Sequence, residues 1–136
     1  MRRKGPTVFA STFLLMLAVA VQGRAECLIP PPPCEALAAA DYVFVADTPW
    51  VQWFEADPER VGFMIVERFK GVPREHGYIE ASVFVHNAEA VSFHPDRRYL
   101  VYAIKRSDGV WSTVCSRTRT IRPDDKEVAS LRKCSR

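Results

Sequence analysis

Cys27, Cys34, Cys115 and Cys134 are the residues of this 136-residue chain best suited to covalent or metal chemistry. A structural zinc site needs cysteines or histidines at short spacings such as Cys-x2-Cys. Here six, eighty and eighteen residues separate successive cysteines, and no histidine lies at ligand spacing from them. An even number of cysteines in a short exported chain predicts two disulfides instead. Four cysteines allow three connectivities, and their spacing does not choose among them.

The other reactive side chains form no known catalytic pattern. The chain has no nucleophile elbow, no zinc-protease helix motif, no P-loop and no glycine-rich dinucleotide motif. His76, His86 and His94 fall in or beside predicted loops and strand ends, which favours solvent-exposed histidines over a paired site. The acidic residues are scattered in the manner of a solvated face. We therefore expect no catalysis, no bound metal and no cofactor.

Residues 1–25 have the organisation of an export signal. Residues 2–4 are basic, and an apolar run of 14 residues follows from Val8 to Val21. A membrane-spanning helix needs about 20 apolar residues, so this run is too short. Gly23 and Ala25 place small residues at the −3 and −1 positions of a cleavage site. We expect a cleaved signal peptide, with an uncleaved anchor as the alternative.

The domain that remains, residues 26–136, is expected in the periplasm or outside the cell, with no stable membrane span. Four of the 19 basic residues and none of the 16 acidic ones precede Glu26, so the domain has 15 basic and 16 acidic residues. A general nucleic-acid binder carries a basic surplus, so this class is disfavoured. Residues 26–96 hold 12 acidic and 4 basic residues, whereas residues 97–136 hold 4 acidic and 11 basic ones. We expect the two parts to attract each other, with a basic docking face near the C-terminus as the alternative.

Five strands between two short helices are the expected elements of this domain. Strands are indicated by runs of β-branched and aromatic residues, and the helices by an alanine-rich segment and an acid-capped segment. The sequence predicts helices over residues 34–40 and 123–133 and strands over residues 42–45, 62–69, 78–86, 99–104 and 111–115. A mainly β, five-stranded OB-fold-like barrel follows from this count. We expect Val83, Leu100 and Val101 in its core, because they lie mid-strand in the most apolar segments.

Six segments carry a resemblance to a known family. In chain order they are Pro30–Ala36, Ala40–Val45, Val66–Pro73, Phe93, Tyr99–Ala103 and Cys115–Thr118. Together they resemble the bacterial exported netrin-like proteins, which are similar to the N-terminal domain of tissue inhibitors of metalloproteinases. The resemblance covers essentially the whole domain. It implies an OB-fold barrel with a packed helix, and the disulfides Cys27–Cys115 and Cys34–Cys134.

The chain departs from that family at the residue that binds the protease. In the inhibitors, the first cysteine is the mature N-terminus, and its amine and carbonyl chelate the protease zinc. That cysteine is missing here, as is its partner, expected between Asn87 and Phe93. Glu26 would be the N-terminal residue, with no disulfide of its own to hold its amine, and ordering a flexible amine weakens binding.

A proline-rich ridge, residues 26–33, is the expected binding site. Its run of four prolines is stiff, extended polyproline II sequence, so it loses little entropy on docking. The candidate residues are Glu26, Cys27, Leu28, Ile29 and Pro30, with the Asn87–Phe93 loop beside them. Leu28 and Ile29 form an exposed apolar patch or, alternatively, seal one end of the barrel. If they seal it, the next candidates are Trp50, Trp53 and Phe54.

Three hypotheses of function follow. The first is a non-enzymatic module that binds a protein partner through the ridge. The second is inhibition of a zinc metalloprotease by the same ridge, as the resemblance implies. The third is an envelope enzyme with an unrecognised site, which ranks last because no catalytic constellation is found.

Overall fold

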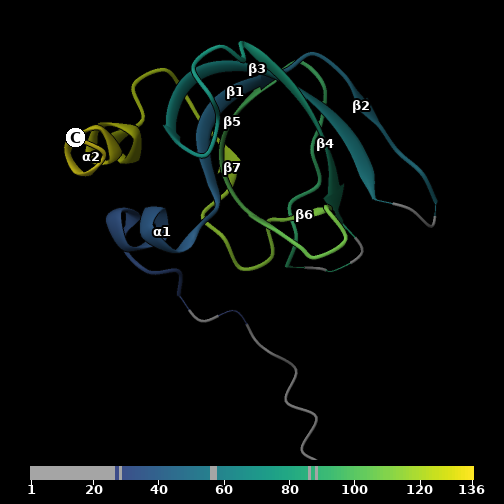
Figure 1. The fold of residues 1–136 in the computed structure, drawn as a ribbon, viewed down its shortest axis with the longest axis horizontal. Coiled ribbons are helices and arrows are strands. Elements are labelled where there is room, and N and C mark those ends of the chain that lie inside the picture. Colours follow the sequence, from purple (N-terminus) through teal and green to yellow (C-terminus); the bar gives the residue numbers. More distant parts are fainter. Residues whose placement is uncertain (1–26, 28, 56–57, 86, 88) are drawn as a thin grey trace, which may run out of the picture.

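The computed structural model describes residues 27, 29–55, 58–85, 87 and 89–136 (Figure 1). The helices are α1 (Pro33–Ala39) and α2 (Lys126–Cys134). The strands are β1 (Tyr42–Thr48), β2 (Val51–Gln52), β3 (Glu59–Lys70), β4 (Tyr78–Phe84), β5 (Arg97–Lys105), β6 (Trp111–Ser112) and β7 (Arg119–Thr120). The expected signal peptide, residues 1–25, lies outside the described residues. Among the described residues, no helix has the length and apolarity needed to cross a bilayer.

Five of the strands close into a barrel. β1 pairs antiparallel with both β3 and β5, and β3 pairs antiparallel with β4. β6 closes the circle, because it pairs parallel with β4 and antiparallel with β5. β2 and β7 are short additions to β3 and β5. The predicted mainly β barrel with two short helices and two disulfides is therefore confirmed.

The barrel has an apolar cluster on each side of its wall where β1 and β5 pair. Phe44 and Val101 point into the interior together with Phe63, Val83 and Phe93. The alternate residues of the same strands, Val43, Val45 and Leu100, pack under α1 and α2 with Leu37, Val128 and Leu131. Both helices lie on this side of the barrel in Figure 1. A strand therefore needs apolar residues at consecutive positions here, because successive side chains point to opposite faces.

The three predicted core residues are all buried, but they do not share one cluster. Val83 and Val101 are in the barrel interior, as expected. Leu100 is fully buried on the outer side of the wall, against the helices. Leu100 is thus a core residue as predicted, and it faces the helices because successive side chains of a strand point to opposite faces.

Three segments differ from the predicted strands. The strand expected over residues 111–115 ends at Ser112, because the chain turns there: the amide of Ser116 donates to the carbonyl of Thr113, and Cys115 is left-handed with φ 55°. The short strand β7 then follows at Arg119, where no strand was predicted. Between β1 and β3, β2 pairs with the start of β3 and forms a hairpin.

Ion pairs partly join the acidic and basic parts of the domain. Arg98 binds Asp47 through two nitrogens at 2.7 and 2.9 Å, and Arg132 binds Glu67 through two at 2.8 Å. The second pair holds the end of α2 against β3. Other described ion pairs, including Arg117–Glu127, lie within one part. Attraction between the parts is thus carried by these two cross-links.

Candidate binding site at the ridge

The two disulfides flank the ridge and fix it to different elements. Cys27 is bonded to Cys115, which follows β6, with 5.2 Å between their Cα atoms. Cys34, in the first turn of α1, is bonded to Cys134 at the end of α2, with 5.8 Å between Cα atoms. This is the connectivity that the resemblance implies.

Ile29 points into solvent from the ridge. Its side chain is 94% exposed, the largest exposed fraction among the exposed large apolar residues of the described chain. Pro31 and Pro32 are also exposed, whereas Cys27 and Pro30 are half-buried. The other predicted site residues, Glu26 and Leu28, lie outside the described residues. Of the two apolar residues predicted to be exposed or to seal the barrel, Ile29 is exposed.

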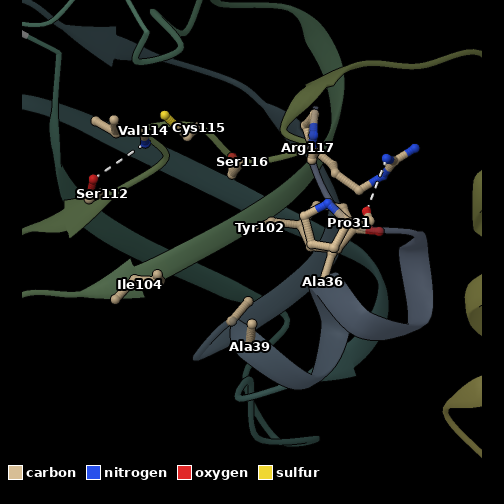
Figure 2. Close-up of a pocket in the computed structure, with 12 residues that line it drawn as sticks. Pro31, Ala36, Ala39, Tyr102, Ile104, Ser112, Val114, Cys115, Ser116 and Arg117 are labelled. Carbon is tan, nitrogen blue, oxygen red and sulfur yellow. Dashed lines mark hydrogen bonds between the residues drawn. The ribbon is translucent and has the colours of Figure 1, made fainter. Parts of the chain in front are cut away.

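Arg117 contacts the ridge directly. Its Nη1 donates to the carbonyl oxygen of Pro31 at 3.2 Å, as the dashed line in Figure 2 shows. Its Nε and Nη2 donate to the two carboxylate oxygens of Glu127, the second at 3.0 Å. One guanidinium therefore joins the ridge to the first turn of α2.

Glu127 is the centre of this contact and is only 9% exposed. Besides Arg117, its carboxylate accepts hydrogen bonds from the hydroxyl of Tyr102 at 2.8 Å and from Nη2 of Arg119 at 3.2 Å. Burial alone would raise the pKa of Glu127, but the hydrogen bonds from Arg117, Tyr102 and Arg119 outweigh it and lower the pKa below its usual value. The carboxylate is thus held as an anion that orients its donors.

The same charge affects the groups around it. Burial, and then the hydrogen bond to Glu127, raise the pKa of Tyr102, so its hydroxyl keeps its proton and remains a donor. The hydrogen bond to Glu127 raises the pKa of Arg117. Asp125 caps α2 by accepting from the amide of Glu127 at 3.0 Å, and it binds Arg119 through two hydrogen bonds. The first turn of α2 is therefore a fixed support.

The segment that carries Arg117 is locked onto β5. The hydroxyl of Thr118 accepts from the amide of Tyr102 at 2.8 Å and donates to its carbonyl at 3.0 Å. The hydroxyl of Ser116 donates to that of Thr118 at 2.8 Å. Each residue of Cys115–Thr118 thus makes a structural contact. Cys115 forms the disulfide, Ser116 and Thr118 attach the segment to β5, and Arg117 contacts the ridge.

The loop predicted beside the ridge contacts the same segment. The amide of Cys115 donates to the carbonyl of Glu89 at 3.4 Å, and the amide of Val91 donates to the hydroxyl of Thr113 at 3.2 Å. The loop reaches Cys115, which is bonded to Cys27. His86 and Ala88 of this region lie outside the described residues.

Glu59 holds the far end of that loop. It is 2% exposed and accepts from the hydroxyl of Ser92 at 2.9 Å and from the amide of Phe93 at 3.2 Å. Phe93 is fully buried in the barrel interior. A buried carboxylate and an aromatic anchor thus fix the loop in which the resemblance led us to expect a further cysteine.

A small apolar groove lies between the ridge and the barrel (Figure 2). It has a volume of about 130 Å³, and its lining residues are Pro30, Pro31, Ala36, Ala39, Ala40, Tyr102, Ile104, Ser112, Val114, Cys115, Ser116 and Arg117. Ile104 is 52% exposed at this place. The surface beside the ridge is therefore apolar, with Arg117 as its charged residue.

Trp50, Trp53 and Phe54 lie elsewhere. The hairpin that carries them projects from the side of the barrel opposite the helices (Figure 1). Trp53 is 55% and Phe54 38% exposed, while the indole of Trp50 lies over Gly62 and donates to the hydroxyl of Tyr78 at 2.8 Å. These aromatic residues form a second exposed surface, separate from the ridge.

Arg117, Glu127 and Glu59 are the site residues that the sequence analysis did not single out. Arg117 lies within the family-like segment Cys115–Thr118, but nothing in the spacing indicates that it faces a residue in the following helix. Glu59 was counted among scattered surface acids, because its burial depends on the loop that closes over it. No cluster of three or more metal-ligating side chains occurs in the part of the chain that the structure describes.

Comparison with known proteins gives no assignment. No model of a protein family matches the chain, and no curated protein matches it.

Proposed function

We propose that this chain is an exported, disulfide-stapled module of the netrin-like type that binds a protein partner through its ridge and has no catalysis of its own. Three features support the proposal: the five-stranded barrel, the disulfide connectivity that the family resemblance implies, and the support of the ridge by the segment after β6. These features are consistent with a scaffold that presents one short segment to a partner.

The exposure of Ile29 is the observation that carries this proposal. An aliphatic side chain that is 94% exposed loses contact with water on docking, and burying such a side chain contributes roughly 1.5–3 kcal/mol. The ridge is already held by the disulfide Cys27–Cys115 and by Arg117. Docking therefore costs little conformational entropy, because few rotatable bonds of the ridge remain to be fixed. Fixed apolar residues of this kind act as anchors at protein interfaces.

A matched pair of substitutions tests the proposal. Ile29→Ser removes the apolar anchor from the ridge, and Val66→Ser removes an exposed β-branched residue from the middle of β3. Oxidised wild-type and variant proteins are immobilised, envelope proteins are captured, and the recovered partner is titrated against each variant. We expect Ile29→Ser to weaken binding at least tenfold with an unchanged melting temperature, and Val66→Ser to bind like the wild type.

The outcomes separate the hypotheses. Equal binding by both variants contradicts the ridge as the site and directs the search to Trp53 and Phe54. A large fall in melting temperature for Ile29→Ser shows that the ridge is structural. A panel of zinc proteases assayed with the wild type tests the second hypothesis, inhibition, in which the N-terminal amine of Glu26 would be the zinc ligand.

A further inference from the structure

We propose that Arg117 is a positioning residue that sets the place of the ridge on the barrel, with Glu127 orienting its guanidinium. The consequence for binding rests on the proposed function, but the positioning itself is testable without a partner. Arg117 is not itself a residue of the ridge. Its role is to hold the backbone at Pro31, two residues after Ile29.

The geometry of the guanidinium makes this role specific. Two nitrogens of Arg117 are occupied by the two oxygens of Glu127, which leaves Nη1 on the opposite edge of the planar group. Nη1 donates to the carbonyl of Pro31. The carboxylate of Glu127 is buried and accepts a hydrogen bond from the hydroxyl of Tyr102 at 2.8 Å, so burial and Tyr102 hold it in place beside the longer contact of 3.2 Å with Arg119. The position of Glu127 in α2 therefore determines where Arg117 holds the backbone of the ridge.

The ridge needs such a contact because its own residues supply few. Its prolines have no amide hydrogen to donate, so their carbonyls are the backbone groups that can fix them. Cys27 anchors the start of the ridge and α1 anchors its end. The Arg117 contact falls between these two anchors, near the place where Ile29 leaves the surface.

Arg119 offers a matched control. It too donates to the carboxylate of Glu127 from the same segment and also binds Asp125, but no described contact joins it to the ridge. Arg117→Met and Arg119→Met each remove one cation from Glu127, and only the first removes the donor to Pro31. Arg117→Lys keeps the positive charge but not the planar fork, so it cannot hold Glu127 and Pro31 in the same way.

The test measures how readily the ridge leaves the barrel. Each protein is treated with a low concentration of dithiothreitol, trapped by alkylation, and mapped by mass spectrometry. The rate of reduction of Cys27–Cys115 is divided by that of Cys34–Cys134 in the same molecule. Global unfolding exposes both disulfides together, so this ratio reports local opening of the ridge.

We expect the ratio to rise about fivefold in Arg117→Lys and Arg117→Met, which corresponds to a net hydrogen-bond contribution of about 1 kcal/mol. Arg119→Met should leave it within twofold of the wild type. Removing a cation near Cys115 slows the attack of a thiolate, so the charge change in Arg117→Met acts against the expected rise. An unchanged ratio in both Arg117 variants overturns the proposal, as does an equal rise in Arg119→Met.

Binding then tests the link to function. Once a partner has been captured, Arg117→Lys should weaken its binding even though Arg117 itself lies behind the ridge. If the reduction ratio rises but no partner binds the wild type, the positioning role stands and the proposed function fails. If a partner binds and the ratio does not change, the proposed function stands and the positioning role fails.

Discussion

At the residue scale, Gly71 shows how a single missing side chain permits the fold. Its φ is 82°, and a Cβ placed there would lie 2.3 Å from the carbonyl oxygen of Asp41. Gly109 has the same φ, but a Cβ there would meet nothing within 4 Å. The two glycines therefore separate the cost of a left-handed conformation from the cost of a close approach.

We predict that Gly71→Ala lowers the free energy of unfolding by more than about 2 kcal/mol, whereas Gly109→Ala costs about 1 kcal/mol, the cost of the left-handed conformation alone. Urea unfolding of the two variants measures both. Equal losses would show that the chain near Asp41 moves freely to accept a methyl group.

Glu127 belongs to the same scale, because one carboxylate links α2, β5 and the ridge. A lowered pKa in the folded state stabilises the protein above the unfolded pKa, near the ordinary value of 4.5, and this stabilisation is lost as the pH falls through the folded value. We predict that Glu127→Gln is less stable than the wild type by about 2 kcal/mol at neutral pH.

This difference should narrow as the pH falls from 4.5 toward the lowered pKa of the folded state, because the carboxylate takes up its proton in the unfolded chain before it does so in the folded protein. Glu75→Gln, at an exposed acid in the turn between β3 and β4, is the control and should follow the wild type at every pH. A difference between Glu127→Gln and wild type that stays constant down to pH 2 would contradict the role of the charge.

At the scale of elements, β5 is the strand on which the two apolar clusters depend. Leu100 packs under the helices and Val101 fills the barrel, and both are fully buried. We predict that Leu100→Asp and Val101→Asp each cost about 4 kcal/mol or more, because each buries a charge without a partner. If only one face of β5 were buried, one of these two substitutions would leave the free energy of unfolding nearly unchanged.

Ile104→Asp on the same strand provides the comparison. Its side chain is 52% exposed, so the charge stays in water and the cost should be about 1 kcal/mol or less. Thermal and urea unfolding rank the three variants. Similar melting temperatures for Leu100→Asp and Ile104→Asp would refute packing of the helices on this face.

The elements also show what the sequence could and could not predict. Alternation identified β4, and an apolar run identified β5, because local burial patterns follow from strand geometry. The same reasoning extended β6 to Cys115, because the residue types there do not indicate the turn in which the amide of Ser116 donates to the carbonyl of Thr113 and Cys115 has a positive φ. Leu100 was correctly predicted to be buried, but an apolar run does not tell which of its residues meet the helices.

The surroundings of the candidate site were predictable to the same degree. The ridge, its two flanking cysteines and the loop beside it were identified from prolines, cysteines and the family resemblance. The Arg117–Glu127 contact was not, because it joins residues of two elements whose relative position is set only by packing. Long-range pairing of charged side chains has no periodic signature in a single sequence.

At the scale of the whole molecule, both disulfides tie the N-terminal part of the described chain to its C-terminal part. Cys27 and Cys115 are separated by 88 residues, and Cys34 and Cys134 by 100. In the chain-entropy account, closing loops of this length stabilises the folded state by about 4–5 kcal/mol each, and the difference between the two loops is negligible. Their effects on the folded protein should nevertheless differ.

We predict that the variants Cys27→Ala/Cys115→Ala and Cys34→Ala/Cys134→Ala lose similar free energies of unfolding in urea. In native conditions, the first should become sensitive to thermolysin within residues 27–29, before the proline run, while the second should become sensitive at Leu131 in α2. The reason is that loop closure acts on the unfolded chain, whereas each bond locally holds a different element.

Free energies of unfolding that differ between the two variants by more than about 2 kcal/mol would show that one bond acts through native contacts rather than loop closure. Cleavage at both sites in both variants would show that the ridge and α2 open as one unit, in which case Glu127 couples them more strongly than either disulfide holds them.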